Sequence, residues 1–186
     1  LVLKSVVGED RTGNASMVEQ GLRKKPTYIK TVFDKTDIRK ERPIIHWDGR
    51  LDTRTLDEYL LFAKKALIIG KEAKIPVIGS FLCHLPEKGE GWKEEEWVYT
   101  AERFRDLGFK YVEIDFCPFL EGEDTAKNRE TVLEWYRKAP RLVKSVRGLK
   151  VIPKILNLEF GEDFQLKMVK ASIEGDADGI VIANRI

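Results

Sequence analysis

The stretch YVEIDFC (111–117) decides the fold class of this chain. Its even positions hold only apolar residues, whereas Glu113, Asp115 and Cys117 follow one another at odd positions, so a β-strand here has one apolar and one polar face. A strand in an open parallel sheet is usually apolar on both faces, but in a barrel one face meets the helices and the other points to the axis. The pattern therefore favours a barrel. The residues expected to pack against helices are Val112, Ile114 and Phe116.

Similar short runs recur along the chain. Four of them are predicted strands: LVLKSVV (1–7), IPVIGSFL (75–82), KVIPKI (150–155) and DGIVIAN (178–184). Four stretches between the strands have helical periodicity: 53–70, 94–108, 128–146 and 163–174. Strands that alternate with helices in this way imply right-handed βαβ crossovers and a parallel sheet. The predicted fold class is α/β, as a (β/α)8 TIM barrel.

Several residues mark the ends of the predicted helices. Thr55 and Glu58 have the spacing of a capping box at the start of the first helix. Gly70 and Gly108 are expected in the left-handed conformation that follows a helix. Pro140 is expected to kink or split the third helix, because proline lacks the backbone N–H that the helix needs.

The length of the chain limits how much of a barrel it forms. A complete eight-stranded barrel takes about 250 residues, whereas this sequence has 186, starting and stopping in a predicted strand. We therefore expect one (β/α) barrel domain over residues 1–186, incomplete at both ends and covering about strands two to six. The linker over residues 8–52 is expected to be irregular, and so long a loop is usually functional.

Composition excludes several classes of partner. The 33 Lys and Arg residues against 31 Asp and Glu leave a net charge of +2 with the signs interspersed, so neither nucleic acid nor an anionic membrane is an expected partner. The apolar run 75–82 is far shorter than the roughly 20 residues of a membrane helix, and a cytoplasmic protein is expected. Cys83, Cys117, His46 and His84 have no zinc spacing, so no metal is expected, and Cys83 is predicted to lie in the core.

Four segments, in this order, resemble the dihydroorotate dehydrogenase family of FMN-dependent barrel oxidoreductases. The segments are LKSVVGEDRTGN (3–14), IPVIGSFL with WKEEEWVYTAERFRDLGFKYVEIDFCP (75–82 and 92–118), VIPKILN (151–157) and GDADGIVIANR (175–185). The resemblance implies hydride transfer between a pyrimidine-like small molecule and FMN, and hence a role in pyrimidine metabolism. Assembly into a homo-oligomer stays open.

Lys154 carries most of the cofactor prediction. It lies in mid-strand on the opposite face from Pro153 and Ile155, and a lysine that points into a barrel needs an anionic or acceptor partner. The resemblance implies that it binds the pyrimidine edge of the flavin, where its charge would stabilise the reduced ring. Lys4 and Asn184 match other residues that contact the flavin in this family.

The resemblance also implies a catalytic thiol. Cys117 matches the cysteine that removes a proton from the substrate in cytosolic members, a role that needs a nearby cation such as Lys4 to outweigh the charge of Asp115. Asp115 and Asn157 match substrate-binding positions. Since the family has asparagine where this chain has Asp115, an anionic substrate would meet an extra carboxylate, which disfavours dihydroorotate itself.

Three functions remain open from the sequence. The first is the flavin oxidoreductase, with Cys117 as base. The second is a barrel lyase or aldolase in which Lys154 forms a Schiff base, because that role also requires a lysine removed from water. The third is a degenerate barrel that serves as an interaction or structural subunit, which is favoured by the missing family asparagines, as in the IIHWDGRLD segment (44–52) with His46 and Trp47. For Cys117, a buried small residue stays the alternative to a catalytic base.

Overall fold

A five-stranded parallel sheet forms the centre of the chain. The computed structural model describes residues 1–3, 5–7, 29–33, 43–47, 55–86, 88–116, 128–156 and 161–184, with only the backbone of 29–33, 43–47, 183 and 184. The strands of the sheet are β1 (Val6–Val7), β4 (Gly79–Leu82), β5 (Tyr111–Asp115), β6 (Lys150–Leu156) and β7 (Val181–Asn184). All five coincide with the strands predicted from sequence.

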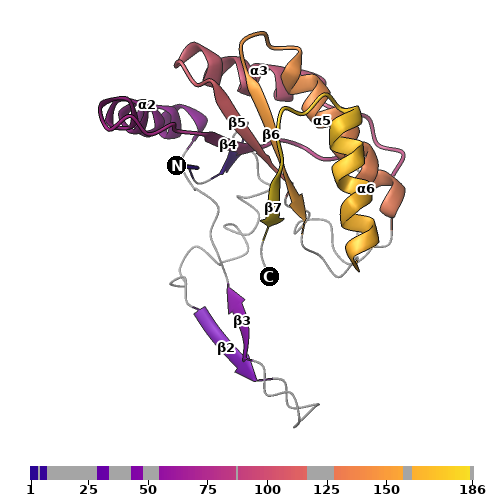
Figure 1. The fold of residues 1–186 in the computed structure, drawn as a ribbon. Coiled ribbons are helices and arrows are strands. Elements are labelled where there is room, and N and C mark those ends of the chain that lie inside the picture. The colour runs from indigo at the N-terminus through magenta and orange to yellow at the C-terminus, as the bar shows by residue number, and fades with distance from the viewer. Residues whose placement is uncertain are drawn as a thin grey trace.

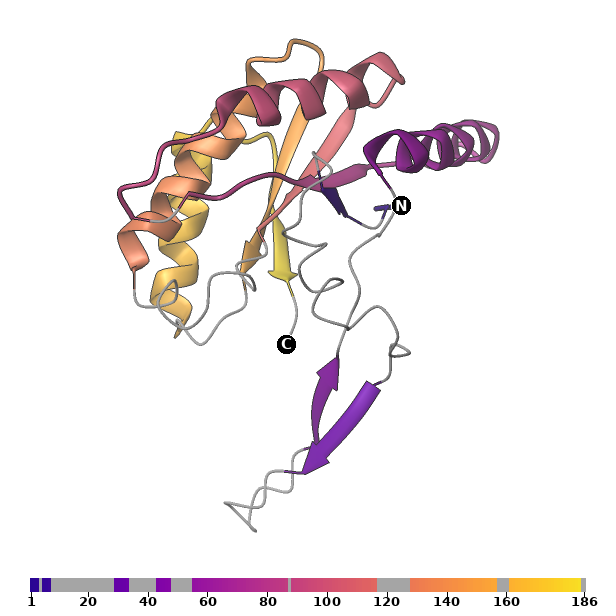
Figure 2. The same cartoon turned by 180° about the vertical axis from the view of Figure 1, so that it is seen from behind.

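The strand order identifies the kind of α/β fold. The order is β1-β4-β5-β6-β7, so each strand pairs in parallel with the next one along the chain. A doubly wound sheet reverses its order at a switch point, and this sheet has no reversal. Its helices α3 (Glu94–Asp106), α5 (Arg129–Lys144) and α6 (Gly161–Glu174) lie along the same side (Figures 1 and 2). The chain thus has the α/β fold of a partial (β/α) barrel, as predicted.

Successive side chains of β5 point to opposite faces of the sheet, as predicted. Val112 and Ile114 are fully buried in the core beneath the helices, and the Phe116 ring packs 4.1 Å from the ring of Tyr136 on α5. Glu113 and Asp115 therefore lie on the opposite side of the sheet, which we call the inner face. Cys117 lies outside the described residues.

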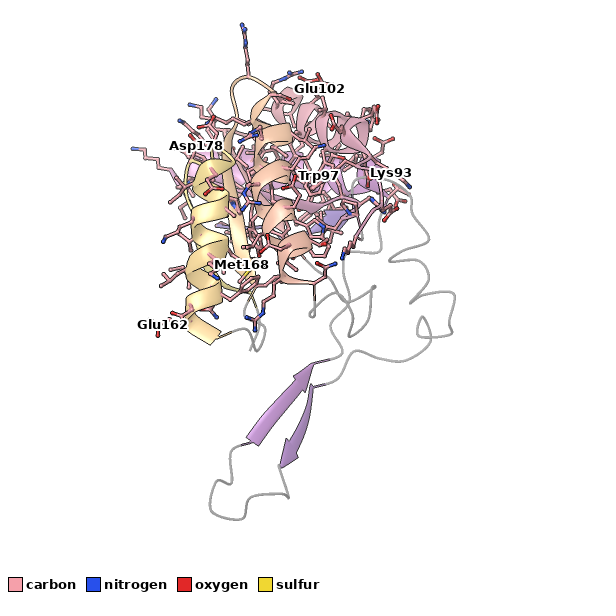
Figure 3. The ribbon with its side chains drawn as sticks, turned by 90° about the vertical axis from the view of Figure 1, so that its right-hand side faces the viewer. Lys93, Trp97, Glu102, Glu162, Met168 and Asp178 are labelled. Atoms are coloured by element: carbon pink, nitrogen blue, oxygen red, sulfur yellow. The ribbon has the colours of Figure 1, made fainter. Side chains whose placement is uncertain are left out.

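Four helices connect the strands. They are α2 (Leu56–Glu72), α3 (Glu94–Asp106), α5 (Arg129–Lys144) and α6 (Gly161–Glu174). The capping box is present, since the Thr55 hydroxyl accepts from Glu58 N–H at 3.2 Å and the Glu58 carboxylate accepts from Thr55 N–H at 3.0 Å. Gly108 has the expected positive φ of 99°. Met168, halfway along α6, is fully buried (Figure 3).

One prediction about helix ends was wrong, and one alternative of another is excluded. Gly70 does not follow α2 but lies inside it, where a Cβ atom would collide with the side chain of Val77, so glycine is needed there for close packing. The residue with positive φ after this helix is Lys74. Pro140 does not split α5, which runs as one helix through it, because burial of that helix face outweighs one lost backbone hydrogen bond.

The linker prediction also needs correction. Within residues 8–52, expected to be irregular, β2 (Ile29–Phe33) and β3 (Pro43–Trp47) form an antiparallel pair with Ile29 opposite Trp47. Both segments contain β-branched residues, a local preference for strand that the length of the linker had obscured. His46 and Trp47 belong to β3.

Two further expectations concern the core and membranes. Cys83 is buried with 1% exposure, as predicted, and its Sγ lies 3.6 Å from the Thr100 hydroxyl. Within the described ranges, no helix combines the length and the apolar character needed to cross a membrane.

Asp178 fastens the start of β7 to its neighbours. Its carboxylate pairs with Lys144 and Lys150 and accepts a hydrogen bond from Val151 N–H at 2.9 Å (Figure 3 labels Asp178). Partial burial alone would raise the pKa of Asp178, but these three donors outweigh burial and lower the pKa from 3.8 to about 2. The ionised form is therefore the one that stabilises the fold.

We expect Asp178→Asn to lower the free energy of unfolding by up to about 2 kcal/mol at neutral pH, because the fold lowers the pKa of Asp178 from 3.8 to about 2 and the partly exposed carboxylate is screened by solvent. Because the folded-state pKa is depressed, this contribution is present above pH 3.8 and disappears as the pH falls toward about 2. Urea unfolding of parent and variant at both pH values measures it. Asp176→Asn, at an exposed position nearby, is the matched control. A difference that does not shrink in acid would contradict the linkage.

Candidate functional site

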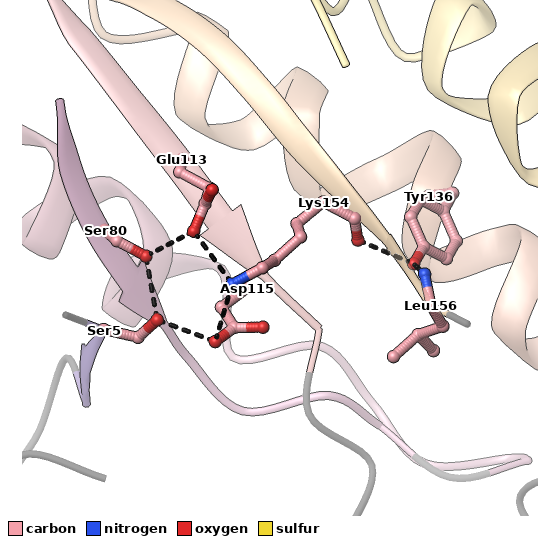
Figure 4. A network of polar contacts seen from close by, with 7 residues as sticks. All are labelled: Ser5, Ser80, Glu113, Asp115, Tyr136, Lys154 and Leu156. Atoms are coloured by element: carbon pink, nitrogen blue, oxygen red, sulfur yellow. Dashed lines mark hydrogen bonds and ion pairs between the residues drawn. The ribbon is translucent and has the colours of Figure 1, made fainter. Parts of the chain in front are cut away.

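Five polar side chains, from three adjacent strands and the residue before a fourth, meet on the inner face of the sheet (Figure 4). Ser5 directly precedes β1, Ser80 lies on β4, Glu113 and Asp115 lie on β5, and Lys154 lies on β6. We call this set the inner-face ring. It occupies the side of the sheet opposite the helices.

The contacts within the ring are short. Ser80 Oγ lies 2.8 Å from Glu113 Oε1 and 2.8 Å from Ser5 Oγ, and Ser5 Oγ lies 2.7 Å from Asp115 Oδ2. Lys154 Nζ closes the ring, at 3.3 Å from Glu113 Oε1 and 3.8 Å from Asp115 Oδ2. Each group is therefore held by two others.

Strand register brings these residues together. Ser80 pairs with Glu113 across β4 and β5, and Asp115 pairs with Lys154 across β5 and β6. Ser5 comes one residue before Val6, which pairs with the residue after Ser80. Residues in register across parallel strands share a face, so the five polar groups converge although they are up to 149 positions apart in sequence, between Ser5 and Lys154.

The side chains of the ring are less exposed to water than those of an ordinary surface ion pair. Glu113 has 2% exposure and Ser80 none, whereas the Lys154 side chain keeps 22%. Buried carboxylates need a counter-charge or hydrogen-bond donors to offset the loss of hydration. The prediction that Lys154 must have an anionic partner is confirmed, since it has two.

Tyr136 holds the carboxyl end of β6 from the helix side. Its hydroxyl donates to the Lys154 carbonyl oxygen at 2.9 Å and accepts from Leu156 N–H at 2.8 Å. Burial raises the pKa of Tyr136 well above its usual value, and although the Leu156 N–H lowers it, the charge of Asp115 raises it further. The phenol therefore stays protonated and keeps its bond to the strand that carries Lys154.

The six residues predicted for the site are placed as follows. Asp115 and Lys154 are brought into contact. Asn184 ends β7, and its backbone pairs with Leu156, at the same edge of the sheet. The other three, Lys4, Cys117 and Asn157, lie outside the described residues, and the functional roles assigned to all six remain predictions.

Three members of the ring were missing from the sequence-based site. Glu113 could have been included, because alternation already put it on the same face as Asp115. Ser5 and Ser80 gave no such signal, since serine is common and only the register between β1, β4 and β5 brings them to the carboxylates.

The chemistry of the ring limits what it can bind. No group of three potential metal ligands occurs in the described part of the chain. The Lys154 charge is already balanced by Glu113 and Asp115, so the ring fits the anionic reduced flavin poorly. What the ring does offer is an amine next to two carboxyl groups, which suits proton transfer at a nitrogen atom.

Comparisons with known proteins say little about the function of this chain. No family model and no curated protein matches the chain. Among the solved structures similar to it is a Schiff-base-forming fructose-1,6-bisphosphate aldolase, with 18% identity and a TM-score of 0.41. The match covers 67% of this chain and only 44% of the aldolase chain. A likeness this distant assigns no function.

Proposed function

We propose that the inner-face ring is the site of a Schiff-base lyase of the aldolase type, with Lys154 as its nucleophile and a small aldehyde or ketone as substrate. The main support is the contact of the Lys154 amine with two buried carboxylates, Glu113 at 3.3 Å and Asp115 at 3.8 Å. A lysine that attacks a carbonyl carbon must first lose a proton, and an adjacent carboxylate accepts it.

The proposed step balances without a co-reactant. The Lys154 ammonium gives one proton to a carboxylate, its nitrogen lone pair bonds to the carbonyl carbon, and the nitrogen's second proton passes to the carbonyl oxygen. A carboxyl group of the ring then protonates the resulting hydroxyl, and water leaves. One ammonium and one carbonyl become one protonated imine and one water. The imine draws electrons from an adjacent carbon–carbon bond, which is how a lyase breaks that bond.

The positions of the two carboxyl groups along β5 indicate which proton transfer each performs. Glu113 is the deeper group, with 3% of its side chain exposed against 10% for Asp115. Asp115 lies two residues nearer the carboxyl edge of the sheet, where barrel enzymes bind their substrates. We assign the removal of a proton from Lys154 to Glu113, and the protonation of the leaving hydroxyl to Asp115. The step then requires Asp115 to be protonated at its start, and the two carboxyl groups together hold the same number of protons before and after it.

Reductive trapping tests this proposal. The protein is incubated with pyruvate or dihydroxyacetone, sodium borohydride is added, and the modified peptides are identified by mass spectrometry. We expect one stable adduct, on Lys154, that forms only when carbonyl compound and borohydride are both present. Labelling spread over exposed lysines such as Lys64 and Lys167, or no labelling, would reject the proposal.

A second candidate is the FMN-dependent oxidoreductase implied by the resemblance to the dihydroorotate dehydrogenase family. One observation favours it: Asn184 ends β7 at the same edge of the sheet as Lys154, as a shared flavin site requires. The absorption spectrum of the purified protein separates the two candidates. Flavin absorbance without trapping would favour this one, and the absence of both would favour a barrel subunit without catalysis.

A further inference from the structure

The two carboxylates of the inner-face ring are joined by a chain of hydroxyl groups. The chain runs from Asp115 through Ser5 and Ser80 to Glu113, with oxygen–oxygen distances of 2.7, 2.8 and 2.8 Å. All three distances are usual for O–H···O hydrogen bonds. Each of the three contacts therefore needs a proton between its oxygen atoms.

A count of protons shows that the hydroxyls cannot supply all three. Ser5 and Ser80 each have one hydroxyl proton, and an ionised carboxylate is only an acceptor. Lys154 Nζ contacts the two carboxylates but lies outside the three oxygen–oxygen contacts. With both carboxylates ionised, one contact would join two oxygen lone pairs, which repel each other at this distance.

We propose that Glu113 and Asp115 share one additional proton through Ser5 and Ser80, so that the ring contains a proton relay. In one arrangement Glu113 is protonated and donates to Ser80, which donates to Ser5, which donates to Asp115. In the other arrangement every donor and acceptor is reversed. A concerted shift of three protons converts one into the other and moves one proton between the carboxyl groups without rotating any side chain.

The charges around the chain agree with this count. Among the described residues, the charged groups that touch it are Glu113 and Asp115 from β5 and Lys154 from β6, and Tyr136 approaches from α5 as a neutral phenol. The additional proton reduces the number of buried negative charges by one, which lowers the cost of burial.

The relay deepens the proposed lyase, on which this part of the inference rests. With the shared proton on Asp115, Glu113 is ionised and takes the proton that leaves Lys154, while Asp115, nearer the edge where the substrate binds, gives its proton to the leaving hydroxyl. The relay then returns one proton from Glu113 to Asp115. Ser5 and Ser80 then act as relay residues rather than as groups that touch the substrate. This role explains why two serines with 6% and 0% exposure lie between two acids.

Infrared spectroscopy of the full chain, without substrate, tests the proton count. At neutral pH we expect the carbonyl-stretch band of a buried, protonated carboxyl group. Glu113→Gln and Asp115→Asn should each remove the band, because an amide N–H then supplies the third proton. Ser80→Ala should also remove the band. In this variant only the contact between Ser5 and Asp115 is left of the three oxygen–oxygen contacts, and the Ser5 hydroxyl supplies its proton.

Two variants serve as matched controls. Glu96→Gln removes the other carboxyl group that is buried among the described residues, and Ser172→Ala removes a fully buried serine whose hydroxyl donates to the Met168 carbonyl oxygen at 2.9 Å. Both should keep the band. Labelling the side-chain carboxyl carbons of Glu and Asp with ¹³C in the parent should shift the band, and this measurement decides the matter even where a variant does not fold.

Three outcomes would overturn the relay: no such band in the parent, a band that survives both amide variants, or a band indifferent to Ser80→Ala. Failure of the relay and failure of the lyase are distinguishable, because the spectrum needs no substrate and borohydride trapping needs no shared proton. A band without trapping keeps the relay and rejects the lyase. Trapping without a band does the reverse.

Discussion

Lys154→Arg is expected to abolish reductive trapping and to lower the rate of any lyase reaction by roughly 10⁴- to 10⁶-fold, as removal of a covalent nucleophile does. Arginine keeps a positive charge beside Glu113 and Asp115 but has no amine that forms an imine. The variant therefore separates nucleophilic attack from ion pairing. The measurements are mass spectrometry after borohydride treatment and the rate with the carbonyl compound that the parent traps.

Two further variants complete this test. Lys154→Met removes the charge as well, and loss of one partner from a buried ion pair costs about 3–5 kcal/mol, so it should be clearly less stable than Lys154→Arg. Lys150→Met changes an exposed lysine on the same strand that pairs with Asp178, and trapping should continue at the parental level. If Lys154→Arg still traps the carbonyl compound at the parental level, another residue is the nucleophile.

Trp135→Ala is expected to destabilise the fold by about 3–5 kcal/mol, the range for removing a large aromatic side chain from a core. Trp135 on α5 is fully buried, and its indole N–H donates to the Pro86 carbonyl oxygen at 2.7 Å. The substitution leaves both a cavity and a carbonyl without its donor. The expected loss is a large part of the 5–15 kcal/mol typical of a domain.

Urea unfolding followed by circular dichroism measures this loss. Trp135→Phe keeps most of the packing and removes only the hydrogen bond, so it should cost about 1–3 kcal/mol. Trp92→Ala is the matched control, because Trp92 is only partly buried at the edge of the same core and should cost less than Trp135→Ala. Equal losses for the two alanine variants would show that burial of Trp135 is not what stabilises α5.

Features encoded within one short segment of the sequence could be predicted, whereas features that depend on residues beyond that segment could not. Period-two alternation correctly placed Val112, Ile114 and Phe116 toward the helices, since one strand carries that pattern entirely by itself. The capping box at Thr55 was equally readable, because both of its hydrogen bonds join residues three positions apart. Gly70 was misread because its partner Val77 lies beyond the end of the helix.

What the sequence determined by itself is the five strands of the parallel sheet and the helices between them, the two faces of β5 and the need of Lys154 for an anionic partner. Only the tertiary structure decided which polar groups meet it. Ser5, Ser80 and Glu113 become neighbours through the register of strands that are joined by long connections. Register depends on how whole strands and helices pack together, and no local pattern at a serine records it. That is why the sequence predicted Lys154 and Asp115 but not the ring that joins them.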